Sequence, residues 1–76
     1  NSELYYNLAL TLQNSGKLEK SRTIYKKALK LDSSDKRIKI GYGRLLLKLN
    51  EKIKGLKILS EGQGVIIFRQ SGVKII

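Results

Sequence analysis

The feature that most constrains the fold is the stretch 2–35, because the residues after it repeat it in weaker form. Residues 34 positions apart match in size, large with large and small with small. The aligned pairs are Leu8/Tyr42, Ala9/Gly43, Leu12/Leu46, Gly16/Asn50, Ser21/Gly55, Ile24/Ile58, Tyr25/Leu59 and Ala28/Gly62. This period is typical of stacked helix pairs. We therefore expect an all-α repeat fold with a first helix hairpin at 2–35, a second, degenerate hairpin at 36–61 and a separate tail at 62–76.

Apolar residues recur at helical spacing in four segments, which predicts helices near 2–15, 18–31, 36–49 and 51–60. Their expected inward stripes are Tyr5, Leu8, Ala9 and Leu12; Ser21, Ile24, Tyr25, Ala28 and Leu31; Ile38, Tyr42, Leu45, Leu46 and Leu49; and Ile53, Leu56, Ile58 and Leu59. Because Leu8 and Tyr25 are large members of these stripes, we expect an alanine at either position to destabilise the fold by about 2–5 kcal/mol.

The helix ends have their own signals. Ser2 and Asp35 are residue types that cap helix N-termini. Gly16 and Asn50 tolerate the left-handed conformation that ends helices. Glycines 41 and 43 lie inside the third helix, which predicts that another element packs close to its backbone. The run 62–64, Gly-Gln-Gly, is expected to break the fourth helix.

The tail differs in character from the rest of the chain. Two β-branched runs, 65–68 and 73–76, flank a Ser-Gly turn, so we expect a short β-hairpin or an extended tail. A hairpin of two strands is marginal in water by itself. We therefore favour a tail that folds back over the last helix, with Phe68 covering Leu56 or Leu59, and caps the array; the alternative is pairing with another chain or with sequence outside this segment.

The composition argues against several kinds of chemistry. The chain contains no Cys and no His, which removes Cys-His and Ser-His nucleophiles and the usual zinc ligands. The six carboxylates form no convincing catalytic pair. We therefore expect no enzyme activity and no cofactor or metal in this segment. No apolar run approaches the length that spans a bilayer, and a chain that opens on Asn1 and contains no Met is expected to be a fragment of a longer, cytoplasmic protein.

The aligned positions resemble the tetratricopeptide repeat family, whose unit is a 34-residue helix-turn-helix. The residues that carry the resemblance are Tyr5, Leu8, Ala9, Leu12, Gly16, Ser21, Tyr25 and Ala28, with YNLA from Tyr6 and YKKALKLD from Tyr25 especially close. Ser21 stands where the family usually has Ala, and Ser33 where it usually has Pro. The resemblance implies a fragment of a right-handed αα superhelix that acts as a scaffold for a protein or peptide partner. It also allows further repeats, or a catalytic domain, elsewhere in the parent chain.

The resemblance further implies that the partner binds the concave face, which is built from the first helix of each pair. The residues on that face that miss the core stripes are Tyr6, Asn7, Leu10, Gln13, Asn14, Arg37, Ile40, Gly41, Arg44 and Lys48. Some family members hold a partner's C-terminal carboxylate there with Asn and basic side chains. Asn7 and Arg37 match two such positions, but Gly41 stands where another basic residue is expected, so the clamp is incomplete.

The net charge of +10 leaves the chemistry of the partner open. A basic surface suits an acidic protein, and it also suits nucleic acid. Nucleic acid is the less favoured alternative, because only Tyr6 and Phe68 lie outside the core stripes to stack on bases. Lys and Ile are both abundant, so the charge could also reflect compositional bias alone. Salt dependence separates the binding modes, since phosphate binding weakens steeply as salt rises.

Overall fold

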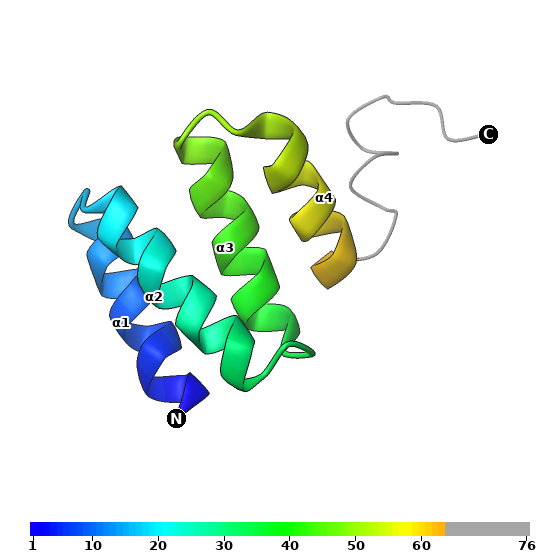
Figure 1. Ribbon diagram of the computed structural model, residues 1–76. Helices are drawn as coiled ribbons and strands as arrows, with labels where there is room; N and C mark the ends of the chain where they lie inside the picture. The colour runs from blue at the N-terminus through cyan, green and yellow to red at the C-terminus, as the bar shows by residue number, and fades with distance from the viewer. Residues whose placement is uncertain (64–76) are drawn as a thin grey trace.

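The computed structural model describes residues 1–63, which form four helices: α1 (Ser2–Asn14), α2 (Leu18–Leu31), α3 (Lys36–Lys48) and α4 (Lys52–Gln63). The helices make two hairpins that lie side by side (Figure 1). The all-α prediction is thereby confirmed for these residues, whereas the expected hairpin or extended tail at 65–76 lies outside them. None of the four helices is both long and apolar enough to cross a membrane.

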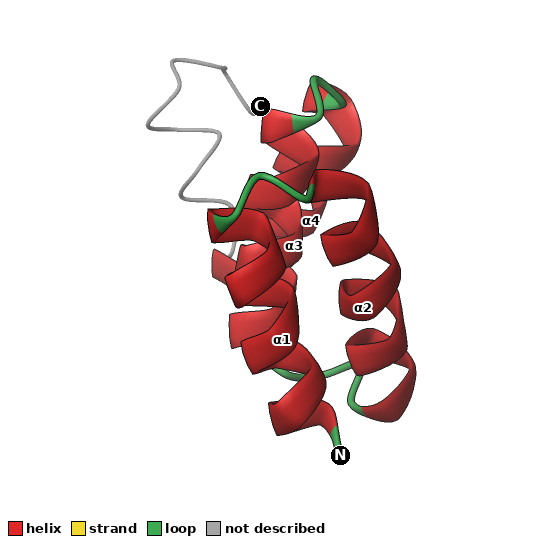
Figure 2. Ribbon diagram, turned by 90° about the vertical axis from the view of Figure 1, so that its left-hand side faces the viewer, coloured by secondary structure: helices red, strands yellow, loops and turns green. Residues whose placement is uncertain are grey.

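Helix α3 connects the two hairpins. It packs most extensively on α4, then on α2, and only slightly on α1. Both hairpin loops lie at one end of the molecule and the connection between α2 and α3 lies at the other, so α1 and α3 run in the same direction (Figure 2). An ion pair joins the hairpins at each end: Arg22 of α2 binds Glu51, and Arg37 of α3 binds Glu3 with 2.6 Å between Nη2 and Oε2.

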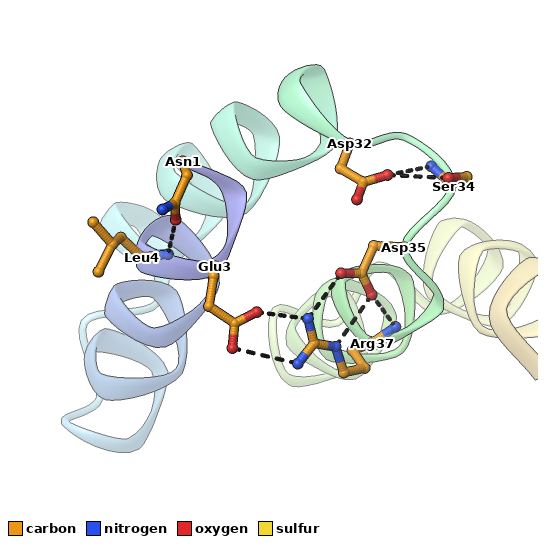
Figure 3. Close-up of polar contacts among 7 residues, drawn as sticks. All are labelled: Asn1, Glu3, Leu4, Asp32, Ser34, Asp35 and Arg37. Atoms are coloured by element: carbon orange, nitrogen blue, oxygen red, sulfur yellow. Dashed lines mark hydrogen bonds and ion pairs between the residues drawn. The ribbon is translucent and has the colours of Figure 1, made fainter.

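The helix ends follow the predicted chemistry with one correction. The N-cap of α1 is Asn1 and not Ser2: the Oδ1 atom of Asn1 accepts a hydrogen bond from the backbone N–H of Leu4 at 2.9 Å (Figure 3). Ser2 is already the first helical residue, so its hydroxyl lies one position too late to cap. Asp35 caps α3 as predicted, accepting from the Arg37 N–H at 2.9 Å.

The two hairpin loops repeat each other in detail. Gly16 and Asn50 have φ of +81° and +66°, as predicted for left-handed helix ends. In the first loop the N–H of Lys17 donates to the Leu12 carbonyl at 2.9 Å. In the second, 34 residues later, the N–H of Glu51 donates to the Leu46 carbonyl at 2.9 Å. The period seen in the sequence therefore repeats backbone geometry and not only side-chain size.

The core lies where the hairpins meet, and it corrects the predicted stripes at three residues. The buried apolar residues are Ala9, Tyr25, Ala28, Ile38, Leu45, Leu46 and Leu59. In contrast, Leu8, Leu31 and Ile53 are 45%, 59% and 87% exposed. The reason at Leu8 is positional: its equivalent Tyr42 lies on the face of α3 that packs against α2, and no earlier hairpin covers the same face of α1 among the residues described.

Small residues let the helices of each hairpin approach closely. In the first hairpin the buried Ser21 hydroxyl donates to the Ala9 carbonyl at 2.8 Å. At the equivalent pair in the second, a Cβ added to Gly43 would lie 3.0 Å from the Gly55 carbonyl oxygen and 2.6 Å from Leu59 Cγ. This contact confirms the close packing predicted at Gly43.

The predicted break of the fourth helix at 62–64 is wrong at its first two residues. Helix α4 continues through Gly62 to Gln63, beyond the expected end near Ser60. Gly62 is buried, and a Cβ there would lie 2.9 Å from Ile40 Cγ1 on α3. Packing on α3 thus keeps the helix intact at a residue whose intrinsic preference is to end it.

The N-cap of α3 predicts a dependence of stability on pH. Hydrogen bonds from the Arg37 side chain, and then from its backbone N–H, hold the pKa of the Asp35 carboxyl below its usual value. Because the pKa is lower in the folded than in the unfolded chain, the interaction stabilises the fold at neutral pH and is lost as the pH falls below about 4. An asparagine at this position would still cap the helix but would not titrate.

We therefore expect Asp35→Asn to lower the free energy of unfolding at neutral pH, and the difference from the parent chain to shrink in acid. Urea unfolding followed by circular dichroism, at neutral pH and in acid, measures this difference in the free energy of unfolding. A difference that stays constant with pH would show that the carboxylate of Asp35 adds nothing to the cap.

Candidate partner-binding groove between α1 and α3

The slight contact between α1 and α3 leaves an open groove of about 550 Å³ between them. The lining side chains are Tyr6, Leu10, Gln13, Asn14, Arg37, Ile40, Gly41, Arg44, Leu47 and Lys48. The structure thus brings together every residue predicted for the concave face except Asn7, which is exposed and does not line the groove. Binding of a partner by these residues stays a prediction.

Sequence reasoning missed Leu47. It follows Ile40 by seven positions and Arg44 by three, which places all three on one face of a helix. This helical spacing is sufficient to place Leu47 among the groove residues. Leu47 ends the run 45–47, Leu-Leu-Leu, whose first two residues are buried in the core, so the apolar pattern does not separate it from them. Leu47 is half-buried and adds to the apolar floor of the groove.

Gln13 lies deeper in the groove than expected. Its side chain is only 7% exposed, and its Oε1 atom accepts a hydrogen bond from the Tyr25 hydroxyl at 2.8 Å. Tyr25 is fully buried and comes from α2, behind the groove. Its hydroxyl also explains Gly41, because a Cβ at that position would lie 2.7 Å from the Tyr25 oxygen. The hydroxyl of the buried Tyr25 therefore reaches the floor of the groove beside Gly41, the position where a further basic residue was expected.

Arg37 lies at the start of α3, and its positive charge is already paired with carboxylates of the chain. Its guanidinium binds Glu3 of α1 and the Asp35 carboxylate, with 3.1 Å from Nη2 to Asp35 Oδ2 (Figure 3). It also lies 5.2 Å from the centre of the Tyr6 ring, in the range of a cation–π contact. These two carboxylates raise the pKa of Arg37. A carboxylate of a partner would have to compete with both of them at this end of the groove.

The opposite end of the groove carries unbalanced positive charge. Arg44 and Lys48 line it, and neither forms an ion pair with any residue in 1–63. No carboxylate of residues 1–63 lines the groove. None of the six Asp and Glu side chains pairs with Arg44 or Lys48 within residues 1–63: Glu3 and Asp35 contact Arg37, Glu19 and Glu51 contact Arg22, Asp32 contacts Ser34, and Glu61 contacts Lys39. The charge of Arg44 and Lys48 is therefore available to an anionic ligand.

Two stacked helix hairpins with a groove between their first helices define a helical repeat protein. Comparison with protein families matches residues 2–35 to the tetratricopeptide repeat, which supports the assignment of this segment to that family. Searches of curated proteins and of solved structures found no match to the chain. Tetratricopeptide repeats generally mediate protein–protein interactions and are typically non-catalytic scaffolds.

Proposed function

We propose that this chain is a scaffold that binds an acidic peptide segment of a protein partner in the groove between α1 and α3. The observation that carries the proposal is the composition of the groove: an apolar floor of Leu10, Ile40 and Leu47 beside Arg44 and Lys48, with no carboxylate from residues 1–63. Apolar side chains of an extended peptide would be removed from water on that floor. Acidic side chains next to them would meet the two cations, which gives orientation and selectivity.

The probe for this proposal is a fluorescein-labelled octapeptide of alternating Leu and Glu, compared by fluorescence anisotropy with a peptide of alternating Leu and Lys. The acidic peptide is expected to bind more tightly. The apolar contacts should keep much of that binding as salt rises from low to physiological concentration. A labelled single-stranded RNA octamer tests the alternative of nucleic acid. RNA binding that exceeds peptide binding and weakens steeply with salt would favour that alternative.

Substitutions locate the binding surface. Arg44→Ala and Lys48→Ala are each expected to weaken binding of the acidic octapeptide by about three- to fivefold, the size of one partly exposed charge pair. Lys26→Ala and Lys27→Ala, which remove exposed cations of α2 that do not line the groove, are the matched controls and should change affinity much less. Equal losses in both pairs of variants would point to diffuse electrostatic attraction and contradict a groove site.

A further inference from the structure

The polar end of the groove contains a side chain that a core residue holds in place. Gln13, Asn14 and Lys48 lie in the last turns of α1 and α3, and Arg44 lies one turn earlier than Lys48. The two helices run in the same direction (Figure 1). These four residues therefore share the end of the groove that is opposite to Arg37. Among them only Gln13 is buried.

The Tyr25 hydroxyl determines which atoms of the Gln13 carboxamide face the groove. It donates to Oε1 at 2.8 Å, so the oxygen points into the core. The Nε2 atom makes no hydrogen bond with any other residue in 1–63, although an amide nitrogen carries two N–H donors. These donors therefore remain available at the floor of the groove.

Packing fixes the orientation of the Tyr25 side chain. Its ring lies against that of Tyr42, with 5.9 Å between the ring centres, and its oxygen lies so close to Gly41 that a Cβ added there would be 2.7 Å away. Burial raises the pKa of the Tyr25 hydroxyl to about 12, so the hydroxyl keeps its proton throughout the physiological range. A protonated, immobile hydroxyl is what a fixed carboxamide orientation requires.

We infer that the Tyr25 hydroxyl positions Gln13 so that its amide N–H groups bind a carboxylate of the ligand, together with Arg44 and Lys48. The inference rests on the proposed function and deepens it, because it places an acidic residue of the peptide at the end of the groove formed by the last turns of α1 and α3. Gln13 contacts the ligand, and Tyr25 acts through Gln13 as a positioning residue. A ligand with a neutral amide in place of the carboxylate would face only hydrogen-bond donors in the site, and the amide's own N–H groups could not pair with them. It would therefore bind more weakly than the carboxylate ligand.

The test observes the side-chain amide resonances of Gln13 by NMR in the isotope-labelled chain, 1–76. The probe is the α-amide of N-acetylglutamate, which carries one carboxylate, and the α-amide of N-acetylglutamine is its neutral control; the two are named N-acetylglutamate and N-acetylglutamine for short. Tyr25→Phe removes only the hydroxyl that orients Gln13. Tyr42→Phe removes the hydroxyl of the neighbouring ring and is the matched control, and Gln13→Met removes the amide itself. Far-UV circular dichroism establishes that each variant is folded.

In the parent chain and in Tyr42→Phe, N-acetylglutamate is expected to shift the Gln13 amide and the Arg44 guanidinium resonances together, while N-acetylglutamine shifts them less. Tyr25→Phe should weaken this response about three- to tenfold. For the acidic octapeptide, Gln13→Met and Tyr25→Phe should each reduce affinity by a similar factor. The double variant should lose no more than either single one, because both changes remove the same interaction.

A purely structural role for Tyr25 predicts a lower melting temperature in Tyr25→Phe with unchanged affinity for N-acetylglutamate, and that result would overturn the inference. So would Gln13 amide resonances that do not move with N-acetylglutamate, or that move equally with N-acetylglutamine. Failure of the octapeptide to bind, with the N-acetylglutamate response intact, would contradict the proposed function and leave the carboxylate site of Gln13 supported.

Discussion

Tyr25→Ala is expected to lower the free energy of unfolding by about 3–5 kcal/mol, because it removes a large aromatic side chain from a fully buried position. The ring fills the space between the hairpins, packs on Tyr42, and lies against Gly41. Its removal also leaves the buried Oε1 of Gln13 without its donor, which adds to the loss. A domain this small has little stability in reserve, so the variant is expected to be largely unfolded at room temperature.

Urea unfolding followed by circular dichroism measures the effect, with Leu8→Ala as the control. The sequence predicted a similar loss of about 2–5 kcal/mol at both positions. The structure changes that expectation for Leu8, which is almost half exposed, and we now expect a loss of about 1 kcal/mol or less. Equal destabilisation by the two variants would mean that an additional surface covers α1 in solution.

Gly43→Ala is expected to destabilise the fold by about 2 kcal/mol, although helix propensity by itself predicts the opposite sign. An alanine inside a helix is more favourable than a glycine by about 1 kcal/mol. Here its Cβ would lie 3.0 Å from the carbonyl oxygen of Gly55 and 2.6 Å from Leu59 Cγ. The backbone of α4 cannot yield locally, so α3 and α4 would have to separate, and overpacking of this kind typically outweighs the gain in propensity.

Whether Gly43→Ala raises or lowers the stability decides between the gain in helix propensity and the cost of overpacking. Thermal unfolding of Gly43→Ala should show a lower midpoint than the parent chain, while Arg44→Ala, at the next and exposed position of α3, should stay close to the parent. A higher midpoint for Gly43→Ala would show that the helices of the second hairpin are not in close contact.

Local patterns in the sequence were sufficient for much of this fold. Helix positions follow from apolar spacing, and the left-handed ends at Gly16 and Asn50 follow from residue type. Gly43 also predicted a place where helices meet closely, and the structure shows a similar close approach at Ala9 and Ser21. These features depend on neighbours in the chain or on a repeat that can be aligned, so no knowledge of the packed structure was needed.

Two of the errors have a common cause. Leu8 and Tyr42 occupy equivalent positions in the repeat, and their surroundings differ only because a hairpin precedes α3. Likewise, α4 continues through Gly62 because α3 packs on it. Periodicity shows which face of a helix is apolar, but it does not show whether another element covers that face.

For the candidate groove, too, one part could be predicted from the sequence and the other depends on the tertiary structure. The repeat and its helical faces, read from the sequence, were enough to collect nearly all of the groove residues from α1 and α3. The tertiary structure alone decided what each side chain does there: Arg37 is engaged by Glu3 from the other hairpin, and Gln13 is held by Tyr25 from behind the groove. Both contacts join residues of different helices, and such contacts exist only after the helices have packed, so no local pattern in the sequence encodes them.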